Sequence, residues 1–325
     1  MGKFPRLMWM MVVLLVPASA LPVHAGSPRE TAKKAPASKF LRITKDAKGE
    51  PLALETATVR YRPAKGEGDL IVDLVSVVHL GERGYYRKLN EQFEQYDVVL
   101  YELVAPKGTR IPKGGRSATD NPLAMIQKIA TLVLNLEMQT DRIDYTRENF
   151  LHADMSPAEM AETIAKRGDD GITLFLSIAA DMLRQQNLLA MKQKESPAKE
   201  ESLDFWAMLT DRTTPSKLKR MMAEQLADLE SPDGALGKTI STILISDRNK
   251  AALKVFQKEL AKGKKKIAIF YGAGHMPDFE KRLRLDFGLE PVSTQWATAW
   301  DLRIREIGIE DILLRLLEER LRARE

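Results

Sequence analysis

The sequence predicts an α/β protein with a split central sheet, flanking helices and a long all-helical insertion. Strand-like and helix-like segments alternate over residues 51–120, and the same alternation resumes over residues 247–325. Between them, over residues 121–246, apolar residues recur at helical spacing. Alternating strands and helices are typical of parallel sheets, so we expect the two outer segments to be halves of one sheet.

Residues 1–25 have the three parts of a secretory signal peptide. Lys3 and Arg6 precede an apolar run over 7–21, and small residues lead to a cleavage position after Ala25. We expect export, to the periplasm or out of the cell, with membrane association only if the leader stays uncleaved. Residues 26–50 are expected to form a flexible mature N-terminus, because residues 26–39 are rich in Pro, Ser, Ala and Lys.

The amino-acid composition excludes cysteine-based chemistry and indicates which partners to expect. The chain has no cysteine, which excludes disulfides, cysteine nucleophiles and cysteine-ligated metal centres. Its 50 Lys and Arg residues are nearly balanced by 45 Asp and Glu residues, so we expect no nucleic-acid partner. Folding must rest on an apolar core, which a chain of 325 residues is long enough to bury.

The first half of the core begins with two strands. Residues 55–62 alternate between polar and apolar types, and residues 69–80 are predicted to pair with them across a glycine-containing turn. Residues 84–96 place apolar side chains on one helical face, and residues 97–104 return to a continuous apolar run. This strand–helix–strand order predicts a parallel pair of strands, 69–80 and 97–104.

The insertion carries a strong helix-start signal. Ser156 and Glu159 form a capping box around Pro157, which suits the first helical position. Further helices are expected over 171–194, 203–211, 215–229 and 235–261, the last broken near residue 246. The second half of the core is predicted to contain a strand over 267–271, a new helix after His275, a strand near 291–299 and a terminal helix over 309–324.

Two histidines follow predicted strands in the same way. His79 ends the apolar run over 75–78, and His275 follows the run over 267–271 after a glycine-rich turn. Glu102 lies near the end of the strand over 97–104, and a carboxylate in such a run needs a partner or a ligand. The carboxyl ends of parallel strands meet at one edge of a sheet, where ligands bind, so we expect these side chains to converge there.

Two imidazoles and a carboxylate allow two versions of hydrolysis. They can bind a divalent metal ion with an open position, or one histidine can act as a general base on water while the other groups orient it. Arg248 begins a predicted helix. It is either an ordinary polar residue at a helix start, a clamp on an anionic group, or the ion-pair partner of Glu102. His152 is either a loop residue or a ligand.

The motifs resemble those of the TraB/GumN-like family, which is related to the Tiki proteases and more distantly to erythromycin-esterase-like and ChaN-like proteins. The matching pieces are the two histidine-ended strands with Glu102, the segment 139–145 that ends in Tyr145, the stretch 152–155, and Asp247-Arg248-Asn249. Ser76 stands where the family has glycine. The resemblance implies an α/β core with a helical insert and a metal-dependent peptidase site of His79, Glu102 and His275.

We therefore expect an exported metal-dependent hydrolase that acts on a peptide or on another amide or ester. The expected catalytic residues are His79, Glu102, His275 and Arg248. Candidate substrate-binding residues are Asn249, Tyr145, His152 and Tyr271. The alternative is a non-catalytic protein that sequesters a peptide or haem in the same cleft, with His275 or Tyr271 as the axial haem ligand.

Overall fold

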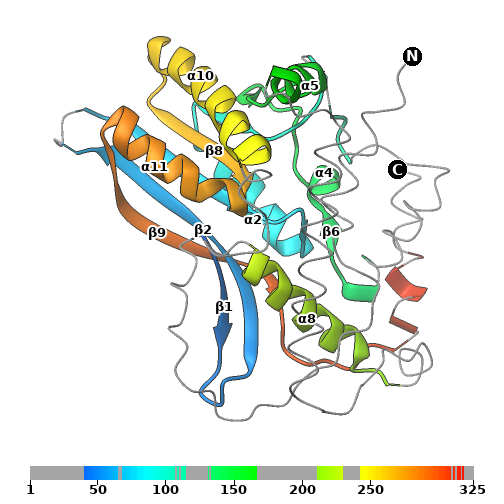
Figure 1. Ribbon diagram of the computed structural model, residues 1–325. Helices are drawn as coiled ribbons and strands as arrows, with labels where there is room; N and C mark the ends of the chain where they lie inside the picture. Colours follow the sequence, from blue (N-terminus) through cyan, green and yellow to red (C-terminus); the bar gives the residue numbers. More distant parts are fainter. Residues whose placement is uncertain are drawn as a thin grey trace, which may run out of the picture.

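A seven-stranded mixed sheet forms the centre of the computed structural model (Figure 1). Its neighbours follow the order β1, β2, β3, β8, β5, β7, and β9 pairs with β2 along the edge opposite β1 and β3. The strands are β1 Leu41–Lys45, β2 Pro51–Pro63, β3 Ile71–Val77, β5 Val98–Tyr101, β7 Phe150–His152, β8 Lys266–Gly272 and β9 Leu289–Asp301. The structure describes residues 40–64, 68–114 except 107 and 110, 131, 133–166, 211–229, 242–308, and 310–317 except 312 and 316.

The four strands β3, β8, β5 and β7 are parallel, and this part of the sheet carries the candidate site. The predicted parallel relation between the strands of 69–80 and 97–104 is confirmed, but the two strands are not adjacent. Strand β8 lies between them and pairs with β3 on one side and with β5 on the other. The two halves of the sequence therefore interleave in one sheet, as predicted for a split core.

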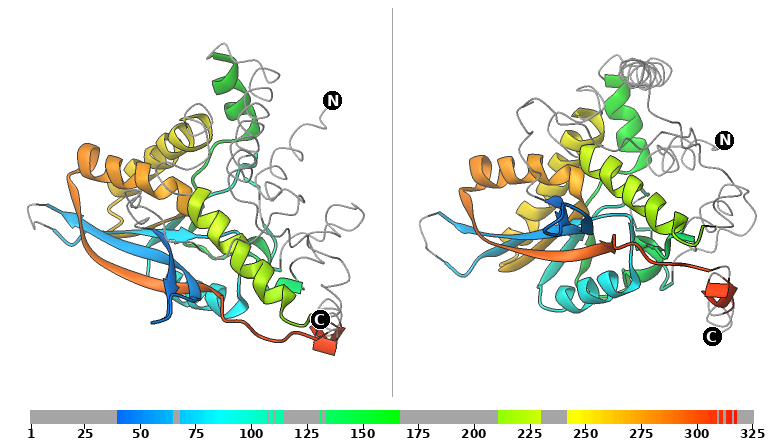
Figure 2. Two further views of the ribbon diagram at one scale, coloured as in Figure 1. Left: turned by 60° about the horizontal axis from the view of Figure 1, so that its bottom comes forward. Right: turned by 90° about the horizontal axis from the view of Figure 1, so that it is seen from below.

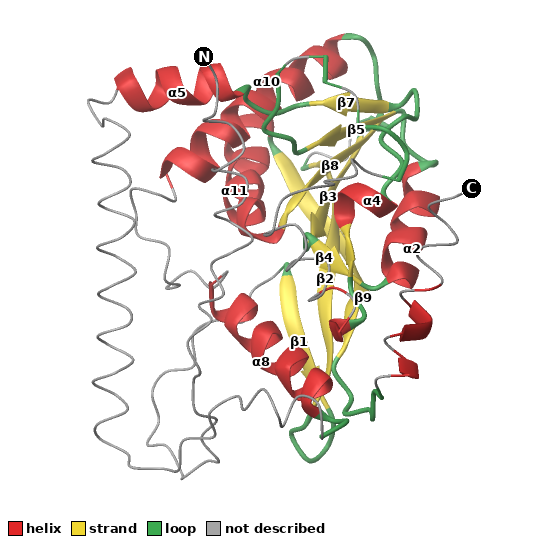
Figure 3. Ribbon diagram, turned by 90° about the vertical axis from the view of Figure 1, so that its right-hand side faces the viewer, coloured by secondary structure: helices red, strands yellow, loops and turns green. Residues whose placement is uncertain are grey.

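Helices cover both faces of this sheet (Figures 2 and 3). On one face, Tyr85, Tyr86, Leu89 and Phe93 of α2 (Arg83–Phe93) pack in one apolar cluster with alternate residues of the strands. On the other face, α10 (Arg248–Ala261) and α11 (Met276–Phe287) form a second cluster with the remaining strand residues. Because strand side chains alternate between faces, a continuous apolar run fills both layers.

The prediction of a flexible mature N-terminus over residues 26–50 is wrong for residues 41–45, which form strand β1. Strand β1 pairs antiparallel with the first half of β2. Phe40 and Leu41 are buried in different apolar clusters, which explains why this short segment is ordered. The lysine- and proline-rich composition that suggested flexibility belongs to the residues before it, which lie outside the described ranges together with the expected leader.

The all-helical prediction for residues 121–246 is also wrong in part. Strand β7 joins the edge of the main sheet beside β5, and β6 (Glu137–Met138) pairs with β4 (Leu80–Gly81) in a small second sheet. A strand of two or three residues is too short to show a hydrophobic period. Its existence depends on the exposed edge that the neighbouring strand offers.

Several expected helices are confirmed. Helix α5 (Pro157–Lys166) begins with the predicted capping box: Glu159 N donates to Ser156 Oγ at 3.2 Å, and Ser156 N donates to Glu159 Oε2 at 2.8 Å. Helix α8 (Thr214–Leu229) matches the expected segment, and the π-helical turn η1 (Thr242–Asp247) precedes α10 at the expected break. The described positions between 310 and 317 are helical. The helix expected over 171–194 lies outside the described ranges, and so does the helix expected over 203–211 except for residue 211.

Within the described ranges, no helix combines the length and the apolar character that crossing a membrane would require.

Candidate active site

The predicted convergence at the carboxyl edge of the parallel strands is observed. His79 follows β3, Glu102 follows β5, and His275 ends the short turn η2 (Ala273–His275) after β8. All three side chains surround Gly272. A Cβ placed on this glycine would lie 3.3 Å from Glu102 Oε2, 3.8 Å from His79 Nε2 and 3.9 Å from His275 Cδ2. The missing side chain of Gly272 therefore leaves the space at which two imidazoles and a carboxylate meet.

Arg248 links the site to the first turn of α10. Its Nη2 donates to Glu102 Oε1 at 2.6 Å and to Asp154 Oδ2 at 2.6 Å, and its Nε donates to Asp154 Oδ1 at 3.0 Å. Its Nη1 lies 3.3 Å from His275 Nε2. The side chains of Arg248 and Asp154 are 10% and 0% exposed. Of the sequence alternatives, pairing with Glu102 is the one observed, and Arg248 positions the carboxylate from inside the protein.

Asp154 is the partner that sequence reasoning did not single out. It lies just beyond β7, at the same edge of the sheet, and besides binding Arg248 it accepts hydrogen bonds from the backbone N–H of Leu103 at 3.0 Å and of Met155 at 2.7 Å. These bonds join the segments that follow β5 and β7. The available signal was an acidic residue two positions after the short segment 150–152, which is too short to be identified as a strand.

Each histidine of the site has a buried amide beside its Nδ1 atom. Gln139, the first residue of α4 (Gln139–Arg142), places its Oε1 3.0 Å from His79 Nδ1. Asn249 in α10 places its Oδ1 2.6 Å from His275 Nδ1. Gln139 was expected only as part of a family-like segment, and its contact with His79 was not predicted.

Electrostatics keep Glu102 ionised and His275 neutral. Burial by itself raises the pKa of Glu102, but the Arg248 guanidinium and the Gly272 N–H, which donates to Oε2 at 2.8 Å, hold that pKa well below its usual value. Burial lowers the pKa of His275 to about 4, and Arg248 acts in the same direction, while Glu102 partly opposes them. At neutral pH His275 thus retains a lone pair on Nε2, which Arg248 Nη1 faces at 3.3 Å.

Stability should depend on pH through His275. Its folded pKa of about 4 lies below the ordinary histidine pKa of about 6.5, so between these values the unfolded chain binds a proton that the folded protein does not. For the metal-free protein we expect the free energy of unfolding to fall by up to about 3 kcal/mol as pH falls across this window. Urea unfolding at several pH values measures it. The variant His275→Gln should show a smaller slope, and an equal slope would contradict the assignment.

The four candidate substrate-binding residues occupy different positions. Asn249 is fully buried and bonded to His275 and Asp278, so it positions the histidine and does not reach a substrate. Tyr271 is fully buried too, and its hydroxyl donates to the Ala153 carbonyl at 2.5 Å, which removes it as an axial haem ligand.

Tyr145 accepts a hydrogen bond from Gln139 at 2.8 Å. His152 Nε2 lies 2.5 Å from the carbonyl of Leu103, which indicates a structural role.

Ser76, the departure from the family motif, is buried in β3 in register with Tyr271. It is not among the side-chain neighbours of the Gly272 position that define the site. Its Oγ has no hydrogen-bond partner among the described residues.

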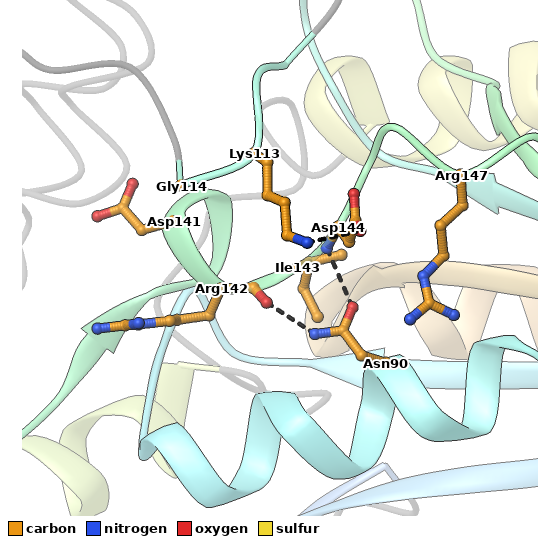
Figure 4. Close-up of a pocket in the computed structure, with 8 residues that line it drawn as sticks. All are labelled: Asn90, Lys113, Gly114, Asp141, Arg142, Ile143, Asp144 and Arg147. Atoms are coloured by element: carbon orange, nitrogen blue, oxygen red, sulfur yellow. Dashed lines mark hydrogen bonds and ion pairs between the residues drawn. The ribbon is translucent and has the colours of Figure 1, made fainter. Parts of the chain in front are cut away.

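A pocket of about 370 Å³ lies beside α2 and α4, and none of the candidate catalytic residues lines it (Figure 4). Asn90 forms part of its wall. The Asn90 amide donates to the Arg142 carbonyl at 2.7 Å and accepts from Asp144 N at 3.0 Å. These bonds hold the segment that carries Gln139 and Tyr145 against α2. The pocket wall therefore helps to position Gln139, which contacts His79.

The donor types at the sheet edge fit a divalent cation. Two imidazole nitrogens and a carboxylate are ligands of catalytic metal sites, and metal-binding histidines usually have their other ring nitrogen hydrogen-bonded, as both do here. His79, Glu102 and His275 are the residues that would bind the ion. In the present arrangement Glu102 also binds Arg248, and across the described ranges no three His, Asp or Glu side chains stand in a metal-binding group.

Comparison of the chain with protein-family models, with curated proteins and with solved structures found no match in any of the three.

Proposed function

We propose that the protein is an exported hydrolase of the TraB/GumN type that uses a divalent metal ion to cleave a peptide or another amide or ester. One observation carries the proposal: His79, Glu102 and His275, from three different strand ends, surround the open position at Gly272. A purely structural set of strand ends does not require two imidazoles and an ionised carboxylate around one space.

The residues have separate roles in this proposal. A divalent cation bound by His79, Glu102 and His275 would supply Lewis acidity, polarising a substrate carbonyl and lowering the pKa of a water molecule. Without a bound cation, neutral His275 would instead be the group that accepts a proton at Nε2, which lies 3.5 Å from Glu102 Oε1. Arg248 keeps Glu102 ionised and oriented, and Asp154 in turn holds Arg248 in place through two hydrogen bonds.

The test combines metal analysis with hydrolysis of a peptide library by the purified protein. We expect stoichiometric divalent metal, loss of cleavage on adding a chelator, and at least about a 100-fold loss in His79→Ala and in His275→Ala. Glu102→Gln should also lose activity, whereas Glu91→Gln, at an exposed position on α2, should not. Absence of bound metal together with unchanged activity in both histidine variants would refute the proposal.

Export rests on residues 1–25. N-terminal sequencing of the protein recovered from its host is expected to begin at Gly26. A protein recovered only inside the cell with residues 1–25 intact would remove export from the proposal and leave the hydrolase assignment to the preceding test.

A further inference from the structure

The two histidines of the site are held in the same way by two unrelated segments. Gln139 approaches His79 from α4, and Asn249 approaches His275 from α10. In both cases the amide oxygen faces the Nδ1 atom of the ring. Each pair is also linked through the backbone of the histidine: Gln139 N donates to the His79 carbonyl at 2.9 Å, and Asn249 Nδ2 donates to the His275 carbonyl at 3.0 Å.

Hydrogen bonding sets the orientation of the Asn249 amide. Asn249 Nδ2 donates to the His275 carbonyl and to Asp278 Oδ2 at 2.9 Å, and both of these groups are acceptors, so its Oδ1 must face the ring. Asp278 is held in turn by Arg282, whose Nε donates to Oδ2 at 2.7 Å. In the Gln139 amide, Nε2 donates to the Tyr145 hydroxyl at 2.8 Å and Oε1 lies 3.0 Å from His79 Nδ1.

An amide oxygen can only accept a hydrogen bond, so the Nδ1 atom opposite it must carry the proton. In a neutral imidazole the other nitrogen, Nε2, then has the lone pair. The Nε2 atom of His79 lies 3.8 Å from the Cβ position of Gly272, and the Nε2 atom of His275 lies 3.5 Å from Glu102 Oε1. Both lone pairs are therefore placed at the centre of the site, where that of His275 accepts a hydrogen bond from Arg248 Nη1 at 3.3 Å.

We propose that Gln139 and Asn249 are a pair of positioning residues that hold His79 and His275 in the Nδ1–H tautomer, so that both Nε2 atoms serve one centre. The catalytic consequence rests on the proposed function. The tautomers themselves do not, because they follow from hydrogen bonds within the protein. His152 provides an internal reference: its Nε2 faces the Leu103 carbonyl, which only accepts, so His152 must have the opposite, Nε2–H tautomer.

Long-range ¹H–¹⁵N correlation spectra of the full chain, labelled with ¹⁵N-histidine and stripped of metal at neutral pH, test the proposal. We expect Nδ1–H for His79 and His275 and Nε2–H for His152. Gln139→Met should change the tautomer of His79 alone, and Asn249→Leu should change that of His275 alone. Gln139→Glu keeps an acceptor oxygen beside His79 and should retain the Nδ1–H tautomer of that histidine.

The same variants connect tautomer and activity. Loss of an acceptor beside a metal-binding histidine typically lowers metal affinity or activity 10- to 100-fold, so we expect about that loss in Gln139→Met, with recovery in Gln139→Glu. An Nε2–H tautomer at His79 or His275 in the wild-type protein would overturn the positioning assignment even if the protein hydrolyses peptides. The expected tautomers in a protein that binds no metal and cleaves nothing would support the assignment and overturn the proposed function.

Discussion

Replacing Gly272 with alanine is expected to lower hydrolytic activity by about 100-fold or more while changing the free energy of unfolding by less than about 1 kcal/mol. The added methyl group would enter the space shared by His79, Glu102 and His275, at 3.3 to 3.9 Å from their nearest atoms. A substrate atom or a metal ion could not occupy the same space. The backbone of Gly272, with φ −53° and ψ 144°, is accessible to alanine, so the chain can fold normally.

Gly274→Ala is the matched control, because the same substitution two residues later places a methyl group with no heavy atom within 4 Å. It should leave both activity and unfolding unchanged. Peptide hydrolysis, metal affinity and urea unfolding of the two variants separate a blocked site from a damaged fold. Full activity in Gly272→Ala would show that the space at Gly272 is not where chemistry takes place.

Replacing Arg248 with methionine is expected to destabilise the protein by about 3 to 5 kcal/mol, the largest stability effect predicted for a single residue here. The reason is the charge that would remain. Glu102 and Asp154 have 11% and 0% of their side chains exposed, and both are bonded to the guanidinium. Without it, two neighbouring carboxylates would lie buried with no countercharge at this position, and their repulsion and desolvation would oppose folding.

Arg284→Met is the control for the substitution itself. Arg284 pairs with Glu290 on the surface, where both side chains are nearly half exposed, and its loss should cost less than about 1 kcal/mol. Adding Asp154→Asn to Arg248→Met should recover part of the lost stability by removing one buried charge. Urea unfolding of the three variants provides the comparison, and equal effects of Arg248→Met and Arg284→Met would contradict the electrostatic account.

Much of the candidate site could be predicted from local patterns. Apolar runs that end in His79 and His275 identify two strand ends, and the improbable carboxylate of Glu102 marks a third. The capping box at Ser156 and the break before Arg248 are likewise local features, and both are observed. Such features are predictable because hydrophobic period, capping and turn chemistry act over a few residues.

The partners of these residues could not be predicted in the same way. Asp154 and Gln139 follow strands of only three and two residues, which form only where a neighbouring strand offers its edge. Whether Arg248 faces solvent, a ligand or Glu102 depends on how α10 packs on the sheet. Long-range contacts of this kind join positions about 50 to 150 residues apart, as the bonds between Leu103 and Asp154 and between Arg248 and Glu102 show.

The sequence by itself determined that this is an α/β chain with a divided core and that two histidines and a glutamate end its apolar strands. Only the tertiary structure decided that β8 lies between β3 and β5, which brings His275 and the open position of Gly272 between His79 and Glu102. The physical reason is that strand order is set by backbone hydrogen bonds and by packing of both sheet faces against α2, α10 and α11. These contacts join the two ends of the chain, and no local pattern encodes them.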